Sequence, residues 1–67
     1  MELKASRVRL YAWCRRNKSN VGAEITTSWM STHDYNNIRA NLNLHYTYAR
    51  LSVLERRGDR VKCLVKI

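Results

Sequence analysis

The chain has 67 residues and carries 13 Lys and Arg against five Asp and Glu, which gives a formal net charge of +8 at pH 7. This length suits one small domain, and no repeat, low-complexity tract or proline-rich linker divides it. No run approaches the roughly 20 apolar residues of a membrane span, and no apolar leader follows the first residues, so we expect a cytoplasmic protein with no membrane partner. The basic excess indicates an anionic partner such as nucleic acid or an acidic protein.

The first predicted helix covers residues 5–17. Leu10, Trp13 and Cys14 fall on one side of it at helical spacing, and two arginines lie near its C-terminal end, where cations are favoured. We therefore expect Trp13 to anchor the core rather than to form a binding platform.

A short strand and a second helix follow. Residues 23–27 are rich in β-branched side chains, which indicates a strand with Ile25 pointing inward. The second helix is predicted at residues 32–41, because Ser31 can cap it and Asp34 lies in its first turn, where a carboxylate is favoured. Its apolar stripe consists of Tyr35, Ile38 and Leu42.

The third predicted helix covers residues 44–58, mainly 47–57. At about 100° per residue, its apolar and basic side chains separate onto two sides. Its last turn is basic and Gly58 can supply a left-handed cap, so we expect a helix that docks on the core and presents a basic outer face. The inner side consists of Leu44, Thr47, Tyr48, Leu51 and Leu54, and the outer side of Tyr46, Ala49, Arg50, Val53, Arg56 and Arg57.

A strand competes with this helix. Larger apolar or aromatic residues alternate with polar ones along residues 42–48, which is the two-residue period of a half-buried strand. Thr and Tyr also favour strands. Such a strand would turn at Gly58 and Asp59 and return as residues 61–67, but the alternation changes parity at Ala49, so the hairpin would need a bulge. Most residues after Ala49 are good helix formers, which favours the helix.

Residues 61–67 form the clearest predicted strand, with Lys62 and Lys66 on the face opposite an apolar row. Its expected partner is the segment around Ile25. Its exposed edge would allow a homodimer through strand pairing. The apolar row consists of Val61, Cys63, Val65 and Ile67.

The cysteines and histidines form no catalytic or metal motif. Cys14 and Cys63 match no zinc or redox spacing, and a four-ligand metal site would need both of them together with His33 and His45. We expect buried free thiols in a reducing cytoplasm, with a disulfide between the two cysteines as the alternative. Because no glycine-rich phosphate loop or nucleophile motif is present, we expect no enzyme, metal or cofactor.

The predicted order of helix, short strand, helix, turn, helix and strand resembles the winged helix-turn-helix domain of bacterial and phage regulators. The residues that carry the resemblance are TYARLSVLERRGDRV at 47–61, which look like the end of a recognition helix and the first wing strand. The likeness covers roughly residues 31–65 and implies an α+β, mostly helical fold with three helices and a short two-stranded sheet. The wing would be truncated, because one strand follows Gly58.

In that family the recognition helix enters the major groove and the wing contacts the DNA backbone. Arg50 would then form a bidentate contact with guanine, and Ala49 and Val53 would meet a thymine methyl group. We therefore expect a sequence-specific double-stranded DNA-binding protein, a small bacterial or phage transcriptional regulator. The expected DNA-binding residues are His45, Tyr46, Ala49, Arg50, Val53, Arg56, Arg57, Arg60 and Lys62.

Two other functions remain open. The same basic face with Val53 and Tyr46 exposed would suit a small protein-binding module, such as a phage-type inhibitor or adaptor acting on an acidic partner. RNA binding would follow from the strand interpretation, because Tyr46 and Tyr48 would then share a sheet face on which bases stack.

Overall fold

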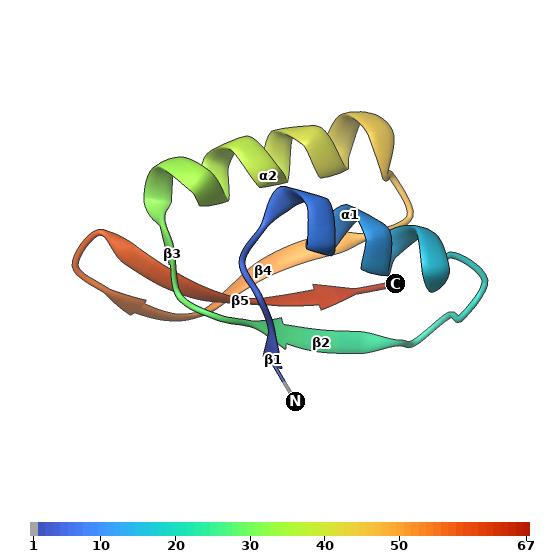
Figure 1. The fold of residues 1–67 in the computed structure, drawn as a ribbon, viewed down its shortest axis with the longest axis horizontal. Helices are drawn as coiled ribbons and strands as arrows, with labels where there is room; N and C mark the ends of the chain where they lie inside the picture. The colour runs from blue at the N-terminus through green and yellow to red at the C-terminus, as the bar shows by residue number, and fades with distance from the viewer. Residues whose placement is uncertain (1) are drawn as a thin grey trace.

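The computed structural model describes residues 2–67 and contains two helices and five strands. Both helices lie on one face of a mixed sheet, so the fold has two layers (Figure 1). The predicted mostly helical fold, with three helices and a two-stranded sheet, is therefore wrong. In chain order the elements are β1 (Glu2–Leu3), α1 (Arg7–Arg16), β2 (Glu24–Thr27), β3 (Met30–Ser31), α2 (Thr32–His45), β4 (Arg50–Arg57) and β5 (Arg60–Lys66).

The central strand of the sheet is β5. It pairs antiparallel with β4 along one side, from Arg50 opposite Lys66 to Arg57 opposite Arg60. Along its other side, β2 pairs with the second half of β5 and β3 pairs with its start. The first strand, β1, lies outside β2 in parallel orientation. Both sides of β5 are thus occupied within residues 2–67, so this strand offers no free edge for pairing, and a homodimer stays a prediction.

The first half of the chain folds largely as predicted. The first helix, the short strand and the second helix are confirmed as α1, β2 and α2, and Ile25 lies opposite Val65, as expected. Ser31 caps α2, because its Oγ accepts a hydrogen bond from the backbone N–H of Asp34 at 3.1 Å. The second helix is longer than predicted and ends at His45 rather than at residue 41.

The helix predicted over residues 44–58 is wrong. Its first two residues end α2, residues 46–49 connect the two elements, and the remainder belongs to β4. The reason lies in β5. The side chains of Val61, Cys63 and Val65 are buried, and the backbone N–H and C=O groups of this central strand need hydrogen-bond partners on both sides. In β4, Leu51 lies opposite Val65 and Val53 lies opposite Cys63, and both continue the apolar row. This pairing outweighs the helix propensity of the segment.

The competing hairpin interpretation is closer to the structure. The chain turns at Gly58 and Asp59, the two central residues of the turn. Gly58 has a φ of +58°, and a type II′ turn requires a positive φ at the first central residue. The bulge lies at Leu54 rather than at Ala49. The β4–β5 hairpin therefore has two full strands, which corrects the expected truncated wing, and its tip extends beyond the helices (Figure 1).

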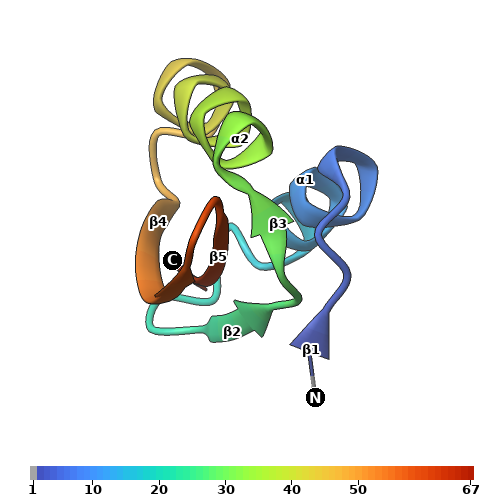
Figure 2. The same cartoon turned by 90° about the vertical axis from the view of Figure 1, so that its left-hand side faces the viewer.

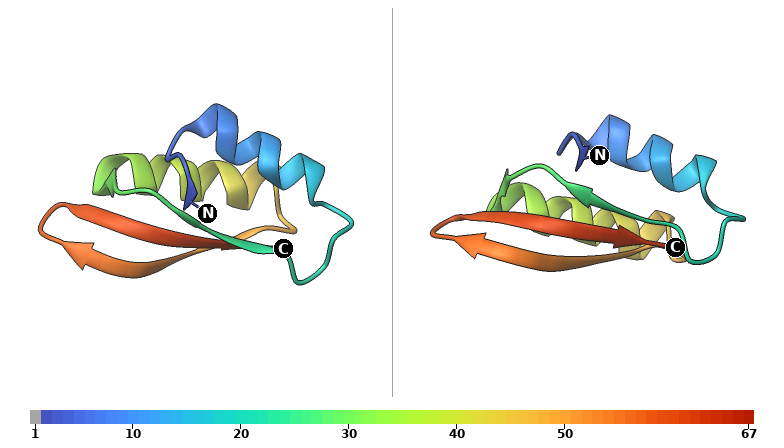
Figure 3. Two further views of the ribbon diagram at one scale, coloured as in Figure 1. Left: turned by 60° about the horizontal axis from the view of Figure 1, so that its bottom comes forward. Right: turned by 90° about the horizontal axis from the view of Figure 1, so that it is seen from below.

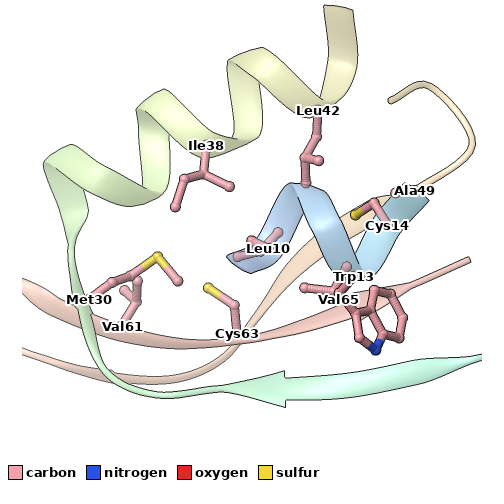
Figure 4. Close-up of a cluster of buried hydrophobic side chains, with 10 residues drawn as sticks. All are labelled: Leu10, Trp13, Cys14, Met30, Ile38, Leu42, Ala49, Val61, Cys63 and Val65. Atoms are coloured by element: carbon pink, nitrogen blue, oxygen red, sulfur yellow. The ribbon is translucent and has the colours of Figure 1, made fainter. Parts of the chain in front are cut away.

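The core lies between the helices and the sheet (Figure 4). Trp13 is only 8% exposed, which confirms its role as a core anchor. Cys14 and Cys63 are buried and free, so the expectation of free thiols is confirmed and a disulfide is not formed. Neither α1 nor α2 has the length and apolar character needed to cross a membrane. The buried apolar residues are Leu10, Trp13, Cys14, Met30, Ile38, Leu42, Ala49, Val61, Cys63 and Val65.

Candidate nucleic-acid interface

Within residues 2–67, no helix covers one face of the sheet (Figures 2 and 3). Val61, Cys63 and Val65 are buried beneath the helices, so the alternate residues of β5 point to the opposite side, which we call the open face. Cations predominate on this face. Its β5 residues are Arg60, Lys62, Leu64 and Lys66, and the pairing register adds Arg50, Ser52, Glu55 and Arg57 from β4 and Glu24 and Thr26 from β2.

Four cations gather near the tip of the β4–β5 hairpin, and we call Arg56, Arg57, Arg60 and Lys62 the hairpin cations. Arg57 and Arg60 are direct cross-strand partners next to the turn. Like charges in this position destabilise a strand pair, and a bound anion would remove that cost. The tip of the hairpin thus favours an anionic ligand.

The carboxylates near the hairpin cations neutralise them only in part. Glu55 lies 3.8 Å from Arg57, but the two side chains are 54% and 78% exposed, and such a pair contributes less than about 1 kcal/mol. Glu2 pairs with Lys62 at the other side of β5. Within residues 2–67, Arg56 and Arg60 form no salt bridge. Most of this positive charge is therefore available to a partner.

An indole ring lies beside these cations. Trp29 lies in the break between β2 and β3, where the chain leaves the ladder with β5. Cζ of Arg57 is 5.3 Å and Nζ of Lys62 is 5.8 Å from the centroid of the ring, within cation–π range. Trp29 therefore holds two of the hairpin cations close together on the open face.

Several of the expected DNA-binding residues lie away from this surface. Ala49 is 4% exposed, and Val53 packs against the core opposite Cys63, so neither can reach a DNA groove. His45 is exposed at the end of α2, at the opposite end of that helix from β3. Of the expected set, the fold brings Arg57, Arg60 and Lys62 together on the open face, and Arg56 is exposed beside them on the other face of the hairpin, opposite Val61.

Tyr46 has a structural position. Its ring stacks on that of Tyr11, with centroids 5.0 Å apart, and its hydroxyl accepts a hydrogen bond from Nη1 of Arg15 at 2.9 Å. Tyr48 meets Tyr46 edge to face, and Lys18 lies over the Tyr48 ring. The two tyrosines thus lie in the α2–β4 connection against α1, and not on a sheet face as the RNA interpretation expected.

Arg50, the expected base-reading residue, lies at the far end of β4 from the hairpin tip. Arg57 lies seven positions further along the chain, which is roughly 23 Å along an extended strand at about 3.3 Å per residue. It lies opposite Lys66 and belongs to a different part of the surface.

Sequence reasoning missed Trp29, because its contacts depend on the break between β2 and β3. The available signal was a lone large aromatic residue within the polar and β-branched run Thr26–Ser31. Arg39 of α2, which lines a cleft next to β4, was also missed, because it is an isolated cation with no local pattern to mark it.

Among residues 2–67, no group of three or more His, Cys, Asp and Glu side chains could hold a metal ion. Comparison of the chain with protein-family models, with curated proteins and with solved structures gave no match. The arguments about function therefore rest on the geometry and charge of this chain.

Proposed function

We propose that this chain binds double-stranded DNA through the hairpin cations. The observation that carries the proposal is the convergence of four cations on an exposed two-stranded ribbon, where only Arg57 and Lys62 have carboxylate partners within residues 2–67. A two-stranded β-ribbon fits the major groove of B-DNA, and arginine and lysine side chains on it can contact phosphates. The ribbon would thus take the place of the recognition helix that the sequence led us to expect.

Double-stranded DNA suits this surface better than single-stranded RNA. Proteins that bind single strands stack the bases on exposed aromatic side chains. The five strands carry no aromatic residue, and the adjoining Trp29 ring already has Arg57 and Lys62 over it. Phosphate contact by the cations is therefore favoured over base stacking.

Preference for particular sequences would come from the shape and deformability of the duplex, because these properties decide how closely its phosphates approach the hairpin cations. A transcriptional regulator needs such a sequence preference. The proposed role is therefore that of a transcriptional regulator in the cytoplasm. The free state of both cysteines is in keeping with a reducing compartment.

An acidic protein partner has less support. Interfaces of that kind have a contiguous apolar centre. The exposed large apolar side chains of residues 2–67 come instead from α1, the loop after it, α2 and β4, and they do not surround the hairpin cations. These side chains are Val8, Val21, Leu44 and Leu54.

The test compares two double variants that remove the same charge. Arg57→Gln with Arg60→Gln removes two hairpin cations, and Arg9→Gln with Arg16→Gln removes two exposed cations from α1. Each lowers the net charge by two. Fluorescence anisotropy would report the affinity of both variants for a labelled duplex of about 20 base pairs, and for a single-stranded RNA of equal length, at about 100 mM salt.

We expect the hairpin variant to lose at least about tenfold in affinity for the duplex and the α1 variant to lose less than about threefold. Selection from a random duplex pool should enrich a few sequences. Equal losses in the two variants would mean that net charge alone drives binding and would contradict the proposal. Tighter binding of RNA than of the duplex would assign the surface to RNA instead.

A further inference from the structure

A cleft of about 440 Å³ runs along the outer edge of β4, next to the second half of α2. Residues from both faces of the sheet line it, with Leu51 on the helix side and Arg50 and Ser52 on the open face. None of the hairpin cations lines the cleft. It is therefore separate from the proposed DNA-binding surface.

Three cations from three elements line the cleft, namely Arg39 of α2, Arg50 of β4 and Lys66 of β5. Within the described part of the chain, no Asp or Glu lines it and none of these cations forms a salt bridge. Arg50 and Lys66 are also direct cross-strand partners, and Glu24 lies opposite Lys66 on the other side of β5. Among residues 2–67, Arg39 and Arg50 are therefore the cations of the cleft with no carboxylate across the strand from them. The charge pattern thus favours an anionic ligand.

The cleft has room for more than a phosphate group. Its volume lies in the range of about 300 to 1,000 Å³ that is typical of small-molecule sites. Leu51 on the helix side and Leu64 on the open face supply apolar lining. Because β4 is paired only with β5, alternate backbone N–H groups of this edge strand point outward along the cleft and can donate hydrogen bonds.

We propose that this cleft binds a nucleoside 5′-phosphate. The phosphate lies among Arg39, Arg50 and Lys66, and the base packs against Leu51 at the edge of β4. This chemistry is shared by a free nucleotide and by the phosphorylated 5′ end of a nucleic-acid strand. The site does not depend on DNA binding by the hairpin cations.

The test is an NMR titration of ¹⁵N-labelled protein with adenosine 5′-monophosphate, adenosine, inorganic phosphate and a 5′-phosphorylated trinucleotide, each added separately. We expect adenosine 5′-monophosphate to shift the amide signals of residues 49–52 and of the C-terminal half of α2. Adenosine and inorganic phosphate should each bind at least about tenfold more weakly, because each lacks one half of the ligand. Tighter binding of the trinucleotide than of the mononucleotide would identify the strand end as the ligand, and the reverse order would identify the free nucleotide.

Arg39→Gln is the deciding variant, and Arg16→Gln is its control, because both residues are exposed on helices and each change removes one charge. We expect about tenfold weaker binding of adenosine 5′-monophosphate in Arg39→Gln and less than about twofold in Arg16→Gln. The Arg57→Gln and Arg60→Gln variant should retain nucleotide binding whether or not it binds DNA. Equal losses in the two single variants, or equally tight binding of inorganic phosphate, would overturn the proposal.

Discussion

The side chain of Thr27 accepts a hydrogen bond from the backbone N–H of Cys63, with Oγ1 and N 3.1 Å apart in the core. Pairing of β2 with β5 ends at Thr26 opposite Leu64, and β3 resumes it at Met30 opposite Val61. The Thr27 hydroxyl thus satisfies a backbone group of β5 at the break in the ladder. The same break allows the chain to bring Trp29 to the hairpin cations.

Thr27→Val should destabilise the fold by about 1–3 kcal/mol, because it leaves the buried N–H of Cys63 without an acceptor while the side-chain volume hardly changes. Urea unfolding followed by circular dichroism measures this loss. Thr27→Ser keeps the hydroxyl and serves as the control, with a smaller loss. Equal stability of the valine variant and the wild type would show that the hydrogen bond contributes nothing.

Gly58→Ala should cost about 1 kcal/mol in the free energy of unfolding, because the residue has a φ of +58° and an L side chain is strained there. A Cβ atom at this position would meet no other atom within 4 Å, so the cost arises from the backbone alone. Gly58→Asn should cost less, since Asn tolerates the left-handed region. Thermal unfolding of the two variants separates these outcomes, and a larger loss for Asn would refute the explanation.

Burial raises the pKa of the Cys63 thiol to about 11, from an ordinary value of 9.0. Because the folded-state pKa lies above the unfolded one, the stability that this group contributes is complete below pH 9 and is lost as the pH rises to about 11. Burial also raises the pKa of the Cys14 thiol. Urea unfolding at several pH values should show stability falling over this interval, with a shallower fall in Cys63→Ala. An unchanged slope in that variant would contradict the assignment.

Tyr46 should contribute to stability and not to DNA affinity. Its stack on Tyr11 and its hydrogen bond from Arg15 tie the α2–β4 connection to α1. Tyr46→Ala should therefore lower the free energy of unfolding by about 2 kcal/mol. Tyr46→Phe keeps the ring and removes the hydroxyl, so its duplex affinity should equal that of the wild type. Loss of duplex affinity in the folded Tyr46→Phe variant would return this tyrosine to the DNA interface.

Local signals were sufficient for α1, β2 and the start of α2, but not for the two-residue strands β1 and β3. Ser31 and Asp34 mark the start of α2 through a cap that needs only neighbouring residues, and the alternation of β5 is intact from Val61 onward. The strand β4 could not be identified in this way. Its bulge at Leu54 changes the parity of its apolar residues, and its many helix formers hide a strand whose stability comes from pairing with β5.

The candidate site was predictable only in part. Sequence alone selects Arg57, Arg60 and Lys62 as phosphate contacts, because they flank Gly58 in a basic run. It placed them on a helix end and a wing, whereas the structure places them on a hairpin. The positions of Trp29 and Arg39 depend on how distant segments pack, and no spacing in the chain encodes those contacts.

The most direct test of the central claim is the salt dependence of duplex binding. Each phosphate neutralised by a cation contributes about −0.9 to the slope of log K against log salt concentration. Arg57→Gln with Arg60→Gln should therefore reduce the steepness of the wild-type slope by about 1.8, whereas Arg9→Gln with Arg16→Gln should leave it unchanged. If the hairpin variant keeps the wild-type slope, the hairpin cations do not contact DNA phosphates and the account is contradicted.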